Sequence, residues 1–357
     1  MFTKNAKTFT DMTIKKIRKK GSLADVIILK DTVMGALQMV LDNKRQQIAP
    51  LEIDPTSLNV VSKKKSIENL SIRDQILPVA TGLSETEKRN VASKYLDTMP
   101  IEQAVELMIN EETRGSRALH ENVSTIAYLV EKICKAFKCG GRLIYVGSGT
   151  SGRLGILDAT ECPPTFKSPP HWVQGVIAGG HKAVQNSVED AEDSVEDGAS
   201  AMIAKDACEK DIVLGIAACG RTPFVWGALH EAKQRKAYTA LLTFNPHLSY
   251  HFKPDTILTV NTGPEVLTGS TRLKAGTATK IVLNMLTTLS MVKYGKVKSN
   301  LMIDLQPLNE KLRDRSLRIV MTILEDPTVT VEEATAVLIK NHYDIKKTVD
   351  ELCTIVG

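Results

Sequence analysis

Short apolar runs alternate with longer helical patterns through the middle of the chain. The runs occupy residues 143–146, 173–178, 212–217, 240–244 and 256–260. Because each run is apolar almost throughout and an amphipathic stretch separates most of them, they predict buried strands of a parallel sheet with helices on both faces. The expected fold class is a doubly wound α/β sandwich, in which ligands bind beyond the carboxyl ends of the strands.

Helical patterns flank these strands on both sides. Between residues 100 and 139 two amphipathic patterns are carried by Ile101, Val105, Leu107 and Met108, and by Ile126, Leu129, Ile133 and Phe137. A long pattern over 273–291 closes the sheet region, and another helix is expected over 312–324. Thr330 and Glu333 match a capping box that opens a further helix, and Ile345, Val349 and Leu352 predict a last one.

Three parts of the chain follow from these patterns. Residues 1–83 form an N-terminal extension to which no chemistry can be assigned, 84–310 form the sheet domain with its preceding helices, and 311–357 form a small helical bundle. The extension holds one apolar helical stretch, 33–41. Its first twenty residues carry seven basic side chains against the single acid Asp11. A basic solvated helix is the favoured interpretation, and an organelle-targeting peptide is the alternative.

Composition excludes several classes of function. The 46 basic and 41 acidic residues leave a net charge of +5, too small an excess to indicate a nucleic-acid partner. The six cysteines contain no C-x-x-C pair, so neither a disulfide framework nor a zinc site is indicated. No run is long enough to span a membrane, and the N-terminus lacks the apolar core of a secretory signal. We expect a cytoplasmic protein with no membrane partner.

The first strand is followed by a glycine-rich loop, 147–153, that satisfies the pattern G-x-G-x-x-G. A dinucleotide site would need an acidic residue at the end of the next strand, but that strand ends in Ala-Gly-Gly at 178–180. The loop instead offers the hydroxyls of Ser148, Thr150 and Ser151 and the guanidinium of Arg153 beside the amides of a helix N-terminus. These donors suit a phosphate monoester.

A second loop, 217–222, follows the third strand and supplies Cys219, Arg221 and Thr222. Either loop alone could be no more than a tight turn between strand and helix. Because both lie at carboxyl ends of neighbouring strands, they should present their donors to one crevice. The pair of loops therefore favours a phosphate monoester as ligand.

Two carboxylates lie close to these loops in the sequence. Glu161 belongs to the segment 158–164, whose prolines are expected to end the helix beside the site. Glu192 belongs to the acidic run 189–193, a pattern that is more often a solvated face. From their chemistry alone, Glu161 and Glu192 are only candidates for a general acid or a general base.

The residues quoted so far form a specific pattern. Segments 141–164, 178–180, 192–194, 215–223, 263–277 and 295–302 closely resemble the N-acetylmuramic acid 6-phosphate etherases, members of the sugar isomerase (SIS) superfamily. The resemblance covers roughly residues 84–320. The tail from about 328 is similar, more weakly, to a ubiquitin-associated-type bundle. Residues 1–80 resemble no family.

The resemblance implies an SIS fold, a homodimer with the site near the subunit interface, a phosphorylated amino sugar as substrate, and no metal or organic cofactor. The implied reaction eliminates D-lactate across C2 and C3 of the ring-opened sugar and then adds water, in peptidoglycan recycling. Glu161 would protonate the departing lactate and activate water, and Glu192 would remove the C2 proton. Buried, mutually repelling carboxyls can hold opposite protonation states. The substrate-binding set implied is Ser148, Thr150, Ser151, Arg153, Cys219, Arg221, Thr222, Glu265, Ser270 and Lys274.

One residue departs from the family pattern, which has serine in place of Cys219. A thiol is a weaker donor than a hydroxyl, so phosphate binding is expected to be weakened rather than abolished.

Two other functions are compatible with parts of the pattern. A sugar-phosphate sensor similar to glucokinase regulatory protein shares the loop, but that family has two SIS domains and needs neither Glu161 nor Glu192. An NAD-dependent oxidoreductase lacks support because the acidic ribose-binding residue is absent. The etherase reaction is therefore favoured.

Overall fold

The core of the molecule is a parallel sheet. The computed structural model describes residues 72–307 and 309–356, so the basic segment 1–20 and the predicted helix 33–41 lie outside the described residues. Within the described part the main sheet has five strands in the order β3-β2-β4-β5-β7, and every pairing is parallel. The strands are β2 (Leu143–Gly147), β3 (Val173–Ile177), β4 (Ile212–Ile216), β5 (Tyr238–Thr243) and β7 (Thr256–Thr259). All five predicted strands are confirmed.

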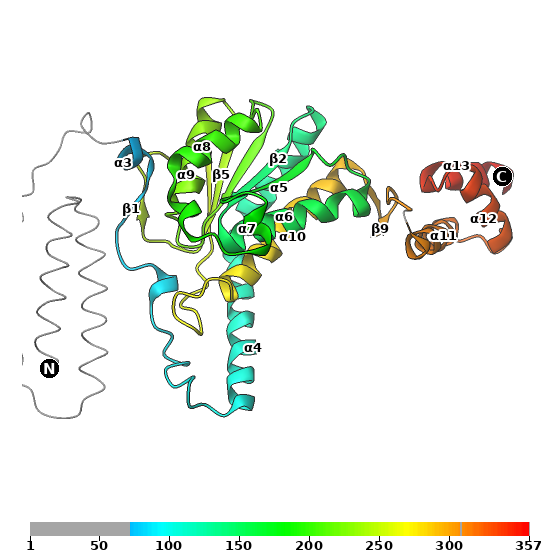
Figure 1. The fold of residues 1–357 in the computed structure, drawn as a ribbon. Coiled ribbons are helices and arrows are strands. Elements are labelled where there is room, and N and C mark those ends of the chain that lie inside the picture. Colours follow the sequence, from blue (N-terminus) through cyan, green and yellow to red (C-terminus); the bar gives the residue numbers. More distant parts are fainter. Residues whose placement is uncertain (1–71, 308, 357) are drawn as a thin grey trace, which may run out of the picture. The chain divides into compact units, whose positions relative to one another are not determined.

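Helices cover both faces of this sheet (Figure 1). Alternate residues of β2 serve the two sides: Leu143 and Tyr145 pack in one apolar core, Ile144 and Val146 in the other. The first core is completed by α5 (Val123–Lys138), α6 (Gly149–Phe166) and α10 (Lys274–Tyr294). The second is completed mainly by α8 (Val195–Ala204) and α9 (Pro223–Gln234). The doubly wound sandwich is confirmed.

The strand order creates a switch point between β2 and β4. From β2 the chain moves to the edge strand β3, returns to β4 on the other side of β2, and then proceeds outward to β5 and β7. The helices that follow β2 and β4 therefore leave the sheet in opposite directions, which opens a crevice beyond the carboxyl ends of these strands. The two predicted phosphate loops follow adjacent strand ends, because Gly147 and Ile216 are register partners.

The sheet domain also contains one long helix and several shorter elements outside the main sheet. A long helix, α4 (Ile101–Arg117), precedes α5, and it extends beyond the sheet in Figure 1. The remaining elements of the sheet domain are α3 (Ile72–Ile76), β1 (Val79–Ala80), η3 (Glu85–Glu87), η4 (Ala118–Asn122), α7 (Lys182–Gln185), η5 (Glu189–Asp193), β6 (Leu248–Ser249), β8 (Val297–Lys298) and β9 (Leu301–Met302). No helix in the described ranges has the length and apolar character that crossing a membrane requires.

The C-terminal helices form their own apolar cluster. They are α11 (Glu310–Leu324), α12 (Val331–Lys340) and α13 (Ile345–Val356). The capping box predicted before α12 is present: the Glu333 amide donates to Thr330 Oγ1 at 3.2 Å, and the Thr330 amide donates to Glu333 Oε2 at 2.9 Å.

One expectation about α6 is wrong. The prolines at 163 and 164 do not end this helix, which continues to Phe166. The Lys167 amide still donates to the Pro163 carbonyl at 2.9 Å, so the last turn is closed although proline lacks an N–H. Glu161 therefore lies inside a continuous helix and not at a helix end beside the phosphate loop.

A buried ion pair joins the starts of β2 and β4. Asp211, whose side chain is 1% exposed, accepts hydrogen bonds from Arg142 Nε at 3.0 Å and Nη2 at 2.5 Å, and from the amides of Arg142 and Cys208. Burial alone would raise the pKa of Asp211, but these donors lower it below its usual value.

Replacing Asp211 should reveal how much the buried ion pair contributes to stability. We expect Asp211→Asn to lower the free energy of unfolding at pH 7 by about 3 kcal/mol, because Arg142 keeps its charge and loses its partner. Because the pKa of Asp211 is depressed in the folded protein, the stabilisation from the ion pair is present above the ordinary aspartate pKa. This stabilisation is lost as the pH falls through the pKa of Asp211 in the folded state. Denaturant unfolding at pH 7 and at pH 3 should therefore show a smaller difference between wild type and variant at pH 3.

The matched control is Asp206→Asn, since Asp206 also pairs with an arginine, Arg235, but its side chain is 96% exposed. Its effect should stay within about 0.5 kcal/mol. Equal effects of the two substitutions would contradict the assignment.

Candidate functional site

The first loop brings α6 very close to the sheet. Gly149 begins the helix with φ +48°, and a Cβ on Gly152 would lie 2.6 Å from Ile177 Cγ1 and 2.8 Å from the Gly147 carbonyl oxygen. Only glycine allows this approach. Ser148 is the N-cap residue, but its hydroxyl does not cap the helix. The amides of the first turn are therefore not closed by their own N-cap side chain.

The Ser148 hydroxyl instead donates to Glu192. The distance from Ser148 Oγ to Glu192 Oε2 is 2.7 Å, although the residues are 44 positions apart. A cavity of about 80 Å³ lies at this contact, lined by Ser148, Gly149, Arg153, Ala178, Ala183, Ser187, Val188 and Glu192. The structure thus places a predicted carboxylate directly at the predicted phosphate loop.

Arg153 holds the segment that carries Glu192. Its Nε donates to the Val184 carbonyl at 3.1 Å and its Nη2 to the Asn186 carbonyl at 2.9 Å. The guanidinium lines the cavity as well. A guanidinium has five N–H groups, so these two bonds are compatible with further donation to an anion.

The second loop lies at the neighbouring strand end. Gly220 adopts φ +73°, and a Cβ there would lie 2.4 Å from Leu248 Cδ1, so glycine is required. Thr222 precedes α9 as its N-cap residue without a capping bond from its side chain, and Pro223 is the first helical residue. Cys219 and Arg221 are half-buried and Thr222 is buried. These three do not line the cavity at Ser148, although their strand pairs with β2.

Thr150 and Ser151 occupy the first turn of α6 and are half-buried. Thr150 packs beside the start of α10, since a Cβ on Gly276 would lie 3.6 Å from its Cγ2. Neither side chain lines the cavity described here.

Glu161 is exposed and remote from the cavity along its own helix. It follows Gly149 by twelve helical residues, which corresponds to about 18 Å along the axis at 1.5 Å per residue. Because α6 runs back from the carboxyl ends of the strands, Glu161 lies toward the opposite edge of the sheet. A single chain does not bring the two predicted catalytic carboxylates together.

A buried cluster one turn before Glu161 was not anticipated from the sequence. Asp158 is 4% exposed and accepts from the Tyr145 hydroxyl at 2.9 Å, and Lys280 Nζ lies 3.8 Å from its other oxygen. Burial raises the pKa of Asp158 and of Tyr145, and that of Cys162 to about 12. The contact joins α6, β2 and α10. No short sequence pattern links these residues, because they are brought together only by the packing of both helices on the strand.

Glu265 and Lys274 hold the start of α10. The Glu265 carboxylate is fully buried and accepts from the amides of Lys274 and Ala275 at 3.1 and 2.9 Å. Lys274 Nζ donates to Glu111 Oε2 at 2.5 Å and to the Pro264 carbonyl at 2.9 Å. Burial raises the pKa of Glu265. Ser270 lies in the connecting turn. None of the three lines the cavity at Ser148, so their substrate contact stays a prediction.

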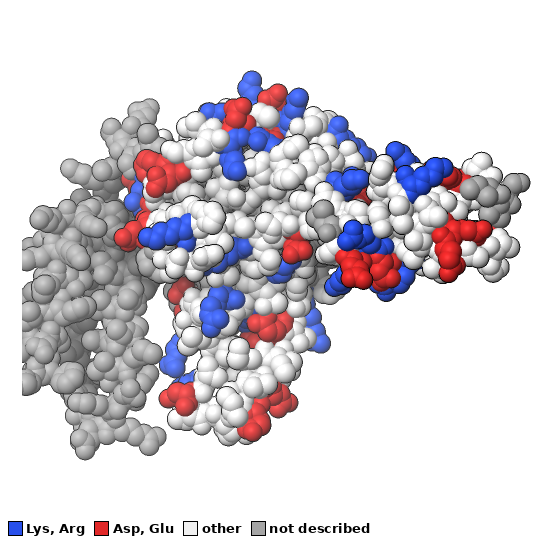
Figure 2. Space-filling view, turned by 45° about the vertical axis from the view of Figure 1, so that its right-hand side comes forward, with Lys and Arg blue, Asp and Glu red and all other residues white. Residues whose placement is uncertain are grey.

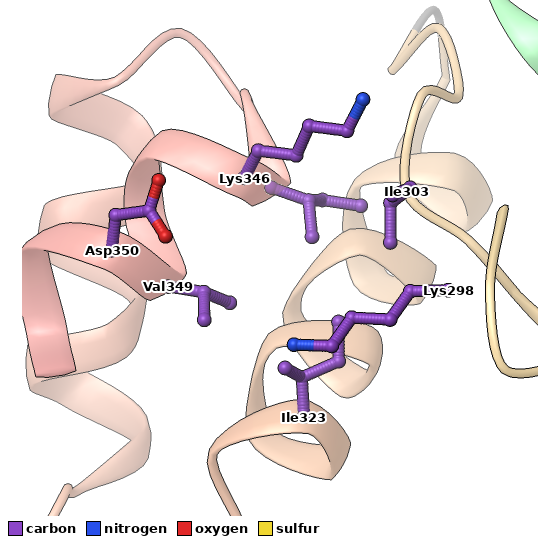
Figure 3. A pocket seen from close by; sticks show the side chains of 7 residues that line it. Lys298, Ile303, Ile323, Lys346, Val349 and Asp350 are labelled. Atoms are coloured by element: carbon purple, nitrogen blue, oxygen red, sulfur yellow. The ribbon is translucent and has the colours of Figure 1, made fainter. Parts of the chain in front are cut away.

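A larger cavity, of about 230 Å³, lies in the C-terminal region (Figure 3). It is lined by Lys298, Ile303, Ile323, Ile345, Lys346, Val349 and Asp350. Lys346 already pairs with Asp304 at 3.5 Å. The walls are mainly aliphatic and include no glycine-rich loop at a helix N-terminus, so the cavity does not match the donors that a phosphate dianion requires.

The surface charge is mixed on the face seen in Figure 2, where Lys and Arg alternate with Asp and Glu. Among residues 72–307 and 309–356 no group of three or more His, Cys, Asp or Glu side chains is placed to hold a metal ion.

Comparison with known proteins identifies the family. Residues 125–233 match the glucokinase regulatory protein N-terminal SIS domain. An N-acetylmuramic acid 6-phosphate etherase of Glaesserella parasuis serovar 5 (strain SH0165) is 45% identical over 269 residues, which cover 75% of this chain and 88% of the relative. The etherase of Lactococcus lactis subsp. lactis (strain IL1403) is 48% identical over 261 residues, covering 73% and 87%.

Solved structures that resemble the chain include the phosphoheptose isomerase GmhA from Neisseria gonorrhoeae, at 15% identity and a TM-score of 0.40 over 54% of this chain and 98% of that one. A phosphoheptose isomerase from Francisella tularensis has 17% identity and a TM-score of 0.39 over 55% and 98%. These scores are too low to support an argument about function. The identity to curated relatives over most of their length is sufficient: the chain belongs to the N-acetylmuramic acid 6-phosphate etherase family.

Proposed function

We propose that this protein cleaves the D-lactyl ether of N-acetylmuramic acid 6-phosphate to yield N-acetylglucosamine 6-phosphate and D-lactate. The observation that carries the proposal is the 2.7 Å hydrogen bond from Ser148 to Glu192, which joins a carboxylate to the phosphate loop. Family membership supplies the substrate. The proposed setting is peptidoglycan recycling in the cytoplasm, with the protein acting as a homodimer.

The loops bind the phosphate in this proposal. The amides at the start of α6 and α9 and the hydroxyls of Ser151 and Thr222 donate to its oxygens, and Arg153 and Arg221 balance its charge. Glu192 lies at the same cavity as the loop, through its hydrogen bond with Ser148, and the proposal assigns to it the proton on C2.

The chemistry has two stages on the ring-opened sugar. Glu192 takes the proton from C2, the C3–O bond breaks, a C2=C3 double bond forms, and Glu161 gives its proton to the departing lactate oxygen. Glu161 then takes a proton from water, whose oxygen adds to C3, while Glu192 returns a proton to C2. Each carboxyl ends the cycle in the state in which it began, so no cofactor enters the balance.

Phosphate recognition can be tested at Ser151. Ser151→Ala should weaken binding of N-acetylglucosamine 6-phosphate by about 1 to 3 kcal/mol, the scale for losing a hydrogen bond to a charged group. Calorimetry gives the affinity, and Ser200→Ala, an exposed serine on α8, is the control. Unchanged affinity in Ser151→Ala would show that the loop does not hold the phosphate.

Cys219 offers a test in the opposite direction. Cys219→Ser should strengthen phosphate binding or raise turnover, because a hydroxyl is a better donor than a thiol. Cys208→Ser, at the other end of the same strand, should leave both unchanged. A serine variant with lower affinity and turnover would mean that Cys219 faces away from the phosphate.

The carboxylates are tested by release of D-lactate. Glu161→Gln and Glu192→Gln should each reduce the rate by roughly 10² to 10⁴-fold, the contribution of general acid and base catalysis, while sugar-phosphate affinity changes little. The exposed Glu209→Gln serves as control. Undiminished lactate release in either variant contradicts the mechanism. A wild-type protein that binds the sugar phosphate and releases no lactate would be a sensor instead.

A further inference from the structure

Four consecutive main-chain oxygens of the second phosphate loop have hydrogen-bond partners. The carbonyls of residues 217–220 accept, in chain order, from the Gly220 amide at 2.9 Å, the Phe244 amide at 3.0 Å, Asn245 Nδ2 at 3.1 Å and Trp226 Nε1 at 2.8 Å. The amides of Cys219 and Arg221 differ, because in the part of the chain that the structure describes nothing accepts a hydrogen bond from either. Main-chain amides in folded proteins are rarely left without an acceptor. These two are therefore available to a bound anion.

The Gly220 carbonyl sets the direction of one of these amides. In a planar trans peptide the C=O and the N–H of the same unit point in opposite directions. The carbonyl of Gly220 and the amide of Arg221 belong to one unit, and the carbonyl points to the indole of Trp226. The Arg221 amide therefore points away from Trp226 and from the apolar core in which that side chain is buried.

The Trp226 side chain is itself held on several sides. It is 0% exposed, and its ring lies edge-on to Phe252 at a centroid distance of 5.9 Å and tilted against Tyr250 at 5.7 Å. Trp226 belongs to α9, the helix that follows the loop. Because protein interiors are packed closely, the indole cannot turn to another acceptor without displacing these neighbours.

Gly220 would otherwise be a point of conformational freedom in the loop. It adopts φ +73°, and glycine populates positive and negative φ about equally. Rotation of the peptide between Gly220 and Arg221 would redirect the Arg221 amide. Such a rotation breaks the bond to Trp226, and the buried Gly220 carbonyl accepts from no other donor within the described ranges. A buried carbonyl without a partner is costly, so the bond to Trp226 keeps the peptide in one orientation.

We propose that Trp226 is a positioning residue for phosphate recognition: its indole N–H holds the peptide between Gly220 and Arg221 so that the Arg221 amide donates to a phosphate oxygen. The proposal rests on the proposed function, which supplies the phosphorylated sugar, and it adds a residue outside both phosphate loops. Trp226 is fully buried and makes no contact with the substrate. It acts through the main chain of the loop.

Asn245 shows that holding a carbonyl of this loop is not sufficient for such a role. Its side chain donates to the Cys219 carbonyl, but the amide of that peptide belongs to Gly220 and already donates to the Ala217 carbonyl. That peptide has no N–H left for a ligand. Of the two described side chains that donate an N–H to these carbonyls, only Trp226 controls a peptide whose amide is available.

Removal of the indole N–H alone tests the proposal. In a Trp172→Phe background Trp226 is the one tryptophan left in the chain. Growth on a tryptophan analogue with sulfur in place of the indole N–H then removes the donor and keeps the shape of the ring. Calorimetry should show roughly tenfold weaker binding of N-acetylglucosamine 6-phosphate and of inorganic phosphate, because the carbonyl loses its donor and the amide its fixed orientation. Equal affinities with the analogue and with tryptophan would overturn the proposal.

Trp172 provides the matched control. It directly precedes β3, at the amino ends of the strands, and stacks on Phe137, whereas the phosphate loops lie at the carboxyl ends. Trp172→Phe with natural tryptophan at position 226 should therefore bind both ligands as the wild type does. Thermal unfolding of the analogue protein measures its stability separately. A lower Tm with unchanged phosphate affinity would assign to Trp226 a role in stability only and would contradict the proposal.

Steady-state kinetics give a further readout that stability alone does not change. The phosphate takes no part in bond breaking, so its contacts are equally strong in the ground state and in the transition state. With the analogue, KM for N-acetylmuramic acid 6-phosphate should rise about tenfold while kcat changes little. A fall in kcat at unchanged KM would contradict a role in phosphate recognition.

A spectroscopic measurement leaves the core side chain intact. In protein isotope-labelled at the indole nitrogens, the two indole NMR signals are assigned by the loss of one of them in Trp172→Phe. Connected hydrogen bonds polarise one another. Saturation with inorganic phosphate should therefore move the Trp226 signal and leave the Trp172 signal in place. A Trp226 signal that stays in place while phosphate binds would count against the proposal.

Release of D-lactate separates the positioning role from the proposed function. If the wild type releases lactate but the analogue leaves phosphate affinity unchanged, the etherase function stands and Trp226 is not a positioning residue. If the analogue weakens phosphate binding and the wild type releases no lactate, the positioning role stands and the etherase function fails. A wild type that binds neither phosphate ligand overturns the positioning role.

Discussion

The close approach of α6 to the sheet is the constraint on which the site depends. A Cβ on Gly152 would lie 2.6 Å from Ile177, one on Gly155 would lie 2.8 Å from the Tyr145 Cβ, and one on Gly175 of β3 would lie 2.6 Å from Ile156 of the helix. Such distances do not occur between real side-chain carbons in a packed interior. Three glycines, from both sides of the contact, therefore allow the helix to lie directly on β2 and β3, with its first turn at the strand ends.

Polar contacts fix the helix along its axis once it lies on the sheet. The Tyr145 hydroxyl binds Asp158, and the buried carboxylate is approached by Lys280 of α10, so a shift of α6 would leave polar groups without partners in the core. The segment carrying Glu192 is held in turn by Arg153, which belongs to the same helix. The loop, the cavity and the carboxylate are thus positioned by one element.

The same rigidity separates Glu161 from the cavity. A continuous helix that begins at the phosphate loop must carry its thirteenth residue toward the opposite edge of the sheet, whatever chemistry that residue performs. Exposed apolar side chains lie on α4 and at Leu157 of α6.

The amino-acid sequence by itself determined the strands, the fold class and the two loops. Apolar runs of strand length and the glycines after them are patterns of neighbouring residues, so they can be identified without knowing how the chain packs. The capping box before α12 was predicted for the same reason, because Thr330 and Glu333 are neighbours along the chain. Relations between distant residues were decided only by the tertiary structure. The bond between Ser148 and Glu192 spans 44 positions. The burial of Lys274 against Glu111 spans 163, and the prolines that were expected to end α6 are accommodated in its last turn. These outcomes depend on which surfaces pack together, and a linear pattern does not specify that.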